Sequence, residues 1–342
     1  MTAIQSLESF SRDAQTTDRW ILSGSCRIML PVPFRQIPAG TPIKRTLLKP
    51  EQALPQALIA TLFFCSAPAC VRAVDMNAYT LGIARLSMAS MGMLAVLLWQ
   101  RKFTPRSWPA RTWRAMLLVG LGFGLHWLLF FTSIKLASAA IGAIGFSTYG
   151  FHLLILGWLM GLGRVTAIDL VGLALAMTGT LLLVPEFSLQ NEHTLGLIAG
   201  VLSGLVAAAL PLLHQRFADV DNNLRTWGQF TFSLPVFFFF WSGTQWQVAS
   251  RDVLLVLYLG FGVALVGHGL WIQATTALST TTTSILSYLY LPGSLIFSYF
   301  AIGERLSGQM LVGAGCVLAA NGLVLWRQSK LRALEANIPE TT

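Results

Sequence analysis

The sequence predicts an all-α membrane protein of ten transmembrane helices, arranged as two inverted five-helix repeats. Three observations lead to this fold class: long apolar stretches, an almost complete absence of charge within them, and a weak self-similarity between the two halves. The composition is 54% hydrophobic and only 11% charged, with a mean hydropathy of +0.64. These values lie outside the usual range of soluble domains. Because buried charges and unpaired backbone groups are costly in hydrocarbon, such a chain is expected to form a bundle of spanning helices.

Ten stretches are long and apolar enough to cross a bilayer, which takes about 20 residues. They are residues 55–72, 77–99, 114–133, 137–160, 166–184, 195–214, 227–246, 253–275, 280–302 and 307–326. We expect all 14 Asp and Glu residues to lie outside the membrane, in the terminal segments or the short connections.

The basic residues indicate the orientation, since an even number of crossings puts both termini on one side. The connections on the N-terminal side and the tail carry Arg101, Lys102, Arg106, Arg111, Arg114, Arg164, Arg216, Arg225, Arg327, Lys330 and Arg332. The opposite side carries only Arg72, Lys135, Arg251 and Arg305. This bias predicts a multi-pass membrane protein with both termini in the cytoplasm. It also explains the net charge of +9 through contact with the lipid bilayer, without a nucleic-acid partner.

The two halves of the spanning region resemble each other. A shift of 141 residues (290 − 149) superposes Tyr149 on Tyr290, and Val171-Gly172 on Val312-Gly313. Leu-Gly-Phe-Gly occurs at 121–124 and again at 259–262. We therefore predict a basic cytoplasmic extension over 1–54, repeats over 55–184 and 195–327, and a cytoplasmic tail over 328–342. A repeat with five crossings must be inverted relative to its copy, an arrangement typical of alternating-access carriers.

The second repeat carries a family resemblance. The run from 277 to 292, which is rich in Ser and Thr and ends in proline, is followed by the turn Gly303-Glu304-Arg305 and a Gly-rich last span. With these features, residues 55–327 resemble EamA-type transporters of the drug/metabolite transporter superfamily. The chain departs from the family pattern at Gly163, where Glu is frequent, and at Phe151, where Pro is frequent. The resemblance implies a ten-helix fold in the bacterial inner membrane that moves small polar metabolites, often outward.

Arg85 is the first candidate for a functional side chain. It lies roughly eight residues into the second span, or about 12 Å from its outer end at 1.5 Å per residue. An ionisable group at this depth indicates function, and an arginine without an acidic partner suits a carboxylate or phosphate on a substrate. Snorkelling outward, or binding to carbonyls of a broken helix, is the alternative.

The histidines form a second group. His126 and His268 occupy comparable places in the third and eighth spans, each after Leu-Gly-Phe-Gly, and His152 shares a helix face with Tyr149. Histidine can carry a proton or bind a carboxylate, although a histidine in a membrane is often only an interhelical contact. We expect His214, at a cytoplasmic helix end, to lie outside the pathway. The histidines are too scattered to predict a metal site, and no cofactor is expected.

Aromatic and hydroxyl side chains complete the predicted lining. Each of them is also compatible with simple packing or with an interfacial belt. The full predicted substrate-binding set is Arg85, His126, Trp127, Tyr149, His152, His268, Trp271, Ser284 and Tyr288. Glu304 and Arg305, by contrast, are expected to anchor a helix end at the outer surface.

These features predict a carrier that exports a small polar, carboxylate-bearing metabolite by alternating access. An amino acid or an amino-acid-derived compound, an opine-type metallophore included, fits this class. Import of a vitamin-like or nucleoside-like compound is the alternative, and the oligomeric state, a homodimer included, is left open. An enzyme is disfavoured because no Asp/Asp, Ser/His or His/Glu pair occurs within the spans. The chain has no Walker sequence, so ATP hydrolysis is not expected. Coupling through a histidine and facilitated diffusion both remain open.

Overall fold

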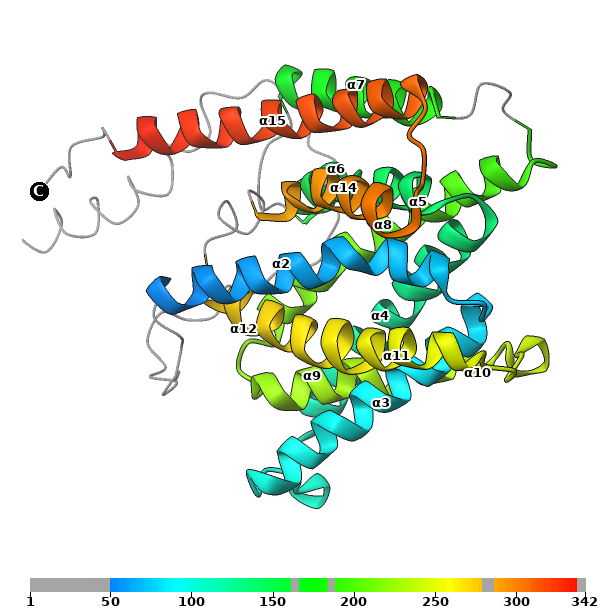
Figure 1. The fold of residues 1–342 in the computed structure, drawn as a ribbon. Helices are drawn as coiled ribbons and strands as arrows, with labels where there is room; N and C mark the ends of the chain where they lie inside the picture. Colours follow the sequence, from blue (N-terminus) through cyan, green and yellow to red (C-terminus); the bar gives the residue numbers. More distant parts are fainter. Residues whose placement is uncertain (1–49, 161–165, 184–187, 279–285, 337–342) are drawn as a thin grey trace, which may run out of the picture. The chain divides into compact units, whose positions relative to one another are not determined.

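A computed structural model describes residues 50–160, 166–183, 188–278 and 286–336. The chain divides into two units, residues 1–42 and residues 43–342, and every described residue belongs to the second. The described residues are helical and contain no strand (Figure 1). Of the predicted N-terminal extension, 1–54, only residues 50–54 are described. Gly163, Arg164 and Ser284 also lie outside the described residues.

The first copy of the repeat contains six α-helices. They are α2 (Pro50–Ala73), α3 (Ala78–Trp99), α4 (Ala110–Leu136), α5 (Ala139–Phe146), α6 (Tyr149–Leu159) and α7 (Ala167–Leu181), with a 3₁₀ turn at Pro105–Ser107. The fourth predicted span is broken between α5 and α6, where the hydroxyls of Ser147 and Thr148 donate to the carbonyls of Ala143 and Gly145, both at 2.7 Å. Such back-bonding competes with the regular helix ladder, which explains the break.

The second copy is more irregular. Its helices are α8 (Glu192–Arg216), α9 (Asn222–Thr231), α10 (Leu234–Phe238), α11 (Val253–Leu257), the π-helical segment η4 (Tyr258–His268), α12 (Gly269–Ala277), α14 (Tyr290–Ile302) and α15 (Gly308–Ala336). Two 3₁₀ turns, Trp241–Gly243 and Ser250–Asp252, lie between α10 and α11. Wide π turns are rare and occur frequently at functional sites, so η4 marks the eighth span as unusual.

The described helices confirm the predicted fold class. Six are long and apolar enough to cross a membrane: Gln52–Ala73, Ala78–Trp99, Ala110–Leu136, Ala139–Leu159, Glu192–Arg216 and Ser250–Ala277. Three shorter apolar helices follow: Ala167–Leu181, Leu286–Ile302 and Gly308–Leu323. Together with the broken segment α9–α10, each predicted span has a helical counterpart among the described residues.

Two predicted spans differ most from the observed helices. The seventh span was placed at 227–246, but its helices run from Asn222 to Phe238. Asp221 begins it earlier because its carboxylate caps the N–H groups of Asn223 and Leu224. The last helix continues past the predicted end at 326 to Ala336, through a polar sequence of good helix formers.

The expectation that every carboxylate lies outside the spans is also wrong. Asp169 stands in the first turn of α7 and is buried, at 1% exposure. Its Oδ2 accepts hydrogen bonds from the backbone and hydroxyl of Thr166, at 2.7 and 2.8 Å, and pairs with Arg327 at 2.5 Å. The carboxylate therefore caps α7 and ties it to α15.

Polar contacts join the connections at one end of the bundle. The backbone N–H of Asp75 donates to Asp252 Oδ2 at 2.9 Å, linking the first connection to the start of the eighth span. Glu304 Oε1 accepts from the N–H of Ala140 at 3.1 Å, so it caps α5, where the helix dipole favours a negative charge. This anchoring contact between the two copies is the kind of role predicted for Glu304.

Connections at the opposite end are joined in the same way. Lys102 pairs with Asp221 at 2.8 Å and Arg111 with Asp219 at 2.6 Å. Both pairs link the second connection to the sixth. In a ten-crossing topology these two connections lie on one side of the membrane. The contacts of Asp75 with Asp252 and of Ala140 with Glu304 lie on the other side, so both sets of contacts agree with this topology.

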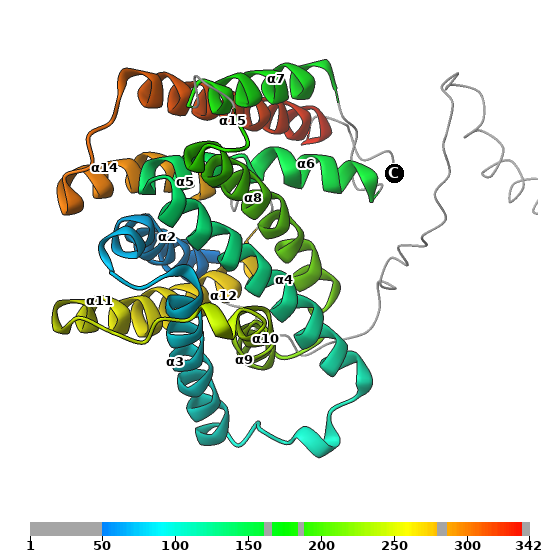
Figure 2. The same cartoon turned by 90° about the vertical axis from the view of Figure 1, so that its right-hand side faces the viewer.

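Close helix packing relies on small residues. In both views α7 and α15 run side by side (Figures 1 and 2). A Cβ added at Gly179 would lie 2.7 Å from the carbonyl oxygen of Gly313, so the two backbones approach too closely for a side chain. In the same views α4 lies beside α8 and α2 beside α14, and the helices α2, α4, α8 and α12 position the site described next.

Candidate functional site

A cavity of about 140 Å³ lies among helices of both copies. A single buried water needs only about 15 Å³, so this space can hold a small molecule. Its lining comes from the middle of α2 and α4, the last turns of α8 and α12, the first turn of α14, and parts of α6, α9 and α15. Most of the lining is aromatic or aliphatic, and no Asp, Glu, Lys or Arg occurs among the described lining residues.

Trp127 lies where the cavity meets the closed part of the bundle. Its ring centroid is 5.0 Å from that of His126 and 5.6 Å from that of His268. On the other side, the guanidinium carbon of Arg85 lies 3.6 Å from the ring centroid, within range of a cation–π interaction. The indole therefore separates Arg85 from the cavity that the histidines line.

Arg85 is fully buried and does not line the cavity. Its Nε donates to the carbonyl of Leu259, in the π-helical segment η4, at 3.1 Å. Its two terminal nitrogens have no hydrogen-bond acceptor among the described residues. Arg85 therefore has features of both interpretations of the sequence. It binds a carbonyl of an irregular helix, and its charge has no acidic partner among the described residues.

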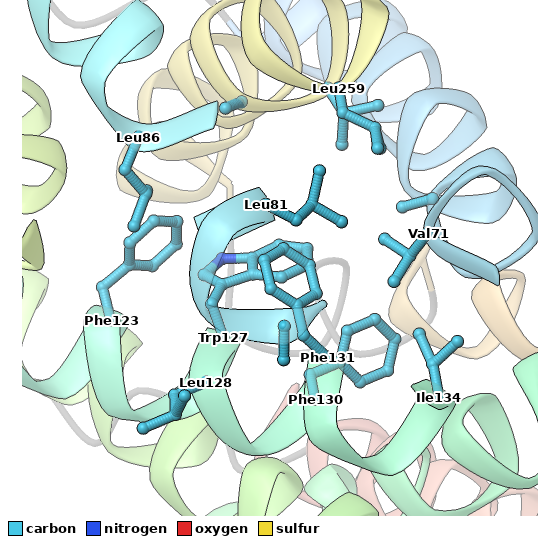
Figure 3. Packing of buried hydrophobic residues seen from close by; sticks show 14 of the residues in the cluster. Val71, Leu81, Leu86, Phe123, Trp127, Leu128, Phe130, Phe131, Ile134 and Leu259 are labelled. Atoms are coloured by element: carbon cyan, nitrogen blue, oxygen red, sulfur yellow. The ribbon is translucent and has the colours of Figure 1, made fainter. Parts of the chain in front are cut away.

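An apolar layer closes the bundle around this arginine. Figure 3 shows Val71, Leu81, Phe131, Ile134 and Leu259 packed together beside Trp127, and all of these residues are buried. They come from α2, α3, α4 and η4, at the end where Asp75 and Asp252 lie. We call these five residues the sealed layer. Apolar side chains therefore fill the bundle beyond Trp127, whereas the cavity lining reaches the last turns of α8 and α12.

His126 and His268, which occupy comparable places in the two repeats, pack against the same phenylalanine, Phe123. The Phe123 ring lies 6.2 Å from the His126 ring and 4.8 Å from the His268 ring. His126 Nδ1 lies 2.8 Å from the Ser203 hydroxyl, whereas His268 Nε2 is buried without a partner among the described residues. His152 does not line the cavity, and its Nε2 lies 3.2 Å from the hydroxyl of Thr148.

The predicted aromatic residues also gather at the cavity. Tyr149, Trp271 and Tyr288 line it, as does Tyr290, the repeat partner of Tyr149. The Phe146 ring lies 6.0 Å from that of Tyr149 and 5.1 Å from that of Tyr290, so the repeat-related tyrosines flank one phenylalanine.

Several polar lining residues were missed in the sequence. His214, Gln229 and Asn321 line the cavity, and His214 contradicts its predicted place outside it. The physical reason is that α8 ends against α9, which brings the last turn of α8 to the cavity. Gln229 and Asn321 stand within predicted spans, so extending the search for intramembrane polar groups from ionisable residues to amides would have found them.

The cavity lining holds both donors and acceptors that lack protein partners. Among the described residues, the indole N–H of Trp127, Nε2 of His268, the hydroxyl of Tyr290 and Oδ1 of Asn321 are buried without hydrogen bonds. An unpaired buried polar atom costs about 1–3 kcal/mol, so these atoms favour a polar ligand or water. No group of three or more potential metal ligands occurs in the described part of the chain.

Comparison with known proteins identifies the family. The EamA-like transporter family matches residues 53–184 and 194–326. The chain belongs to the EamA-like transporter family. The two matches confirm an internally repeated, multi-pass membrane protein. A cavity lined by residues of both copies agrees with a transporter.

Individual relatives are more distant. The chain is 22% identical over 258 residues to a Haemophilus influenzae protein described as an uncharacterized transporter, covering 73% of this chain and 74% of that protein. It is 24% identical over 225 residues to a Salmonella typhimurium protein described as a probable amino-acid metabolite efflux pump, covering 58% and 73%. A crystal structure with 14% identity superposes with a TM-score of 0.60, covering 82% of this chain and 99% of the other, which shows the shared fold.

Proposed function

We propose that this EamA transporter exports a small, carboxylate-bearing metabolite across the inner membrane by alternating access. An amino acid or an amino-acid-derived compound is the substrate class, with an opine-type metallophore as one member. The observation that carries the proposal is the cavity itself: it is enclosed by both copies, holds unpaired polar atoms and contains no acidic residue among its described lining.

Charge supports a carboxylate. Arg85 is buried without an ion pair among the described residues, and it stacks on the Trp127 ring, which lines the cavity. In a medium of low dielectric constant an uncompensated cation attracts an anion strongly. The Asn321 oxygen offers an acceptor at the same cavity, which suits a substrate that also carries an ammonium group.

The position of the cavity supports export. It reaches the last turns of α8 and α12, while the sealed layer closes the other end. In the orientation predicted from the basic residues, with both termini in the cytoplasm, those last turns face the cytoplasm. The cavity is then placed to take up substrate from inside the cell. The description of the Salmonella relative as an efflux pump for amino-acid metabolites points the same way.

The test compares metabolites inside and outside cells that lack or overproduce the protein, by untargeted mass spectrometry. The proposal predicts a carboxylated compound retained in the deletion strain and enriched in the medium on overproduction. Unchanged export, together with a nutrient that the deletion strain no longer takes up, would reverse the direction of transport.

A further inference from the structure

Three side chains form a continuous hydrogen-bonded relay at the cavity edge. Arg225, on α9, is fully buried, and its NH1 donates to Nδ1 of His214 at 3.1 Å and to the His214 carbonyl at 2.8 Å. His214 Nε2 lies 2.9 Å from Oε1 of Gln229. His214 and Gln229 line the cavity.

The arginine determines the proton position on the histidine. A guanidinium has only N–H donors and keeps its proton in proteins. Nδ1 of His214 must therefore present its lone pair to Arg225, and the ring hydrogen of the neutral imidazole is on Nε2. The ring then donates from Nε2, so the atom of Gln229 that faces it must be the carbonyl oxygen. Here the network itself settles the amide orientation, which coordinates alone rarely do.

The remaining group is the NH₂ of Gln229. The residue is 2% exposed and lines the cavity, and its amide nitrogen has no acceptor among the described residues. An acceptor on a molecule in the cavity would give this donor a partner. Hydrogen bonds in a chain also polarise one another, so the cation at the start of the relay strengthens the donor at its end.

We propose that the Gln229 amide is a substrate-binding donor for a carboxylate oxygen, and that His214 and Arg225 are positioning residues that hold its NH₂ toward the cavity. This inference rests on the proposed function, because it concerns a carboxylate substrate in the same cavity.

The relay implies a specific discrimination. A carboxylate offers a charged acceptor to the NH₂ of Gln229 in either orientation, whereas the corresponding amide offers one neutral carbonyl oxygen and must place its own NH₂ elsewhere in the cavity. Hydrogen bonds to a charged group contribute about 1.5–3 kcal/mol, against about 1 kcal/mol for a neutral acceptor. The relay alone therefore favours acid over amide by about 2-fold to 30-fold, and the charge of Arg85 adds to this preference.

The experiment measures this preference directly. The purified full-length protein is titrated with a panel of L-amino acids and with the matching L-amino-acid amides, and the ratio of Kd for amide to Kd for acid is determined. Gln229→Glu replaces the NH₂ by a second oxygen, and Gln229→Met removes the polar group at similar size. Gln215→Glu is the matched control, because Gln215 is exposed at the end of the same helix as His214.

The proposal predicts a ratio above 10 for the wild type and for Gln215→Glu. It predicts the lowest ratio for Gln229→Glu, about 10-fold or more below the wild-type value, because its free oxygen accepts from an amide and repels a carboxylate. Gln229→Met should give an intermediate ratio, because the charge of Arg85 still favours the acid. His214→Phe tests the positioning role: the ratio falls toward that of Gln229→Met while amide binding is retained, whereas simple loss of folded protein weakens both ligands equally.

Two outcomes overturn the inference and separate it from the proposed function. If the wild type binds acids but Gln229→Glu keeps the wild-type ratio, the role of Gln229 is wrong while the carboxylate carrier stands. If the wild type binds neither acids nor amides, both proposals fail.

Discussion

Two arginines in the described bundle are fully enclosed, Arg85 and Arg225, and their surroundings differ. Arg225 donates to carbonyls of Val220 and His214, to the His214 ring and to the Asn222 side chain. Arg85 makes one hydrogen bond, to a π-helical carbonyl, and rests on the face of Trp127. A buried cation with matched acceptors holds structure together. A buried cation without such acceptors, like Arg85, adds little to stability, and its charge remains available to attract an anionic substrate.

The largest effect on stability is expected from Arg225→Met. It leaves the carbonyls of Val220 and His214, the ring nitrogen of His214 and the oxygen of Asn222 without their donor, at a cost of about 3 kcal/mol or more. The melting temperature in detergent should fall clearly, and less protein should reach the membrane. A variant that melts at the wild-type temperature would contradict the claim that Arg225 stabilises the fold.

Arg85→Met should have the opposite profile. It removes a charge that has no ion pair among the described residues, so the melting temperature stays equal or rises. Transport should fall by about 10-fold to 100-fold, as expected for the loss of a Coulomb attraction of about 2 kcal/mol acting across the Trp127 ring.

Vesicle transport of the exported metabolite measures the Arg85 effect, with membrane content determined in parallel. Arg85→Lys is the conservative control, since it keeps the charge and loses the fork of donors. Full transport by Arg85→Met would show that the arginine takes no part in the cycle.

An effect of about 1–3 kcal/mol is expected at the contact of α7 and α15. In Gly179→Ala the new Cβ meets the Gly313 carbonyl at 2.7 Å, so the helices must separate and the melting temperature falls. Gly315→Ala, on α15 with no described atom within 4 Å, is the matched control and should be neutral or slightly stabilising, since Ala favours helix more than Gly. Equal behaviour of the two variants would contradict the close packing.

The smallest effect concerns the exposed pair Arg111–Asp219, outside the hydrocarbon. The hydrogen bond from Arg111 lowers the pKa of the Asp219 carboxyl below its usual value near 3.8. A carboxyl with a depressed pKa stabilises the fold above its unfolded-state pKa, and this contribution is lost as the pH falls through the folded-state value. Screening keeps it within about 1 kcal/mol. Asp219→Asn should therefore leave the melting temperature at pH 7 nearly unchanged and reduce its decrease below pH 4; a large change at pH 7 would contradict this account.

The spans were predictable because they depend on a local property, the length of apolar sequence. The break at Ser147 and the π-helical segment η4 were not, since each depends on hydrogen bonds that apolar periodicity does not record. Asp169 was assigned to a connection although it lies within the predicted span 166–184, because its role as a cap in the first turn of the helix is not visible in the sequence.

The site was partly predictable for a similar reason. His126, His268, Trp127 and Tyr149 stand out as polar or amphipathic groups inside spans, and they do line the cavity. The screening of Arg85 by Trp127, and the relay that reaches Gln229, depend on how α3, α4, α8 and α9 pack. No spacing within one helix carries that information.

The central claim is that substrate passes through the cavity between the two copies, and one pair of glycines on α6 tests it most directly. A Cβ at Gly150 would lie 3.1 Å from Asn321 Oδ1 and 3.2 Å from the Tyr288 hydroxyl, inside the cavity, whereas Gly157 has no described atom within 4 Å. Efflux of the exported metabolite should be measured for Gly150→Leu and Gly157→Leu at equal membrane content. The account predicts that Gly150→Leu abolishes efflux and Gly157→Leu retains it; normal efflux with Gly150→Leu would contradict it.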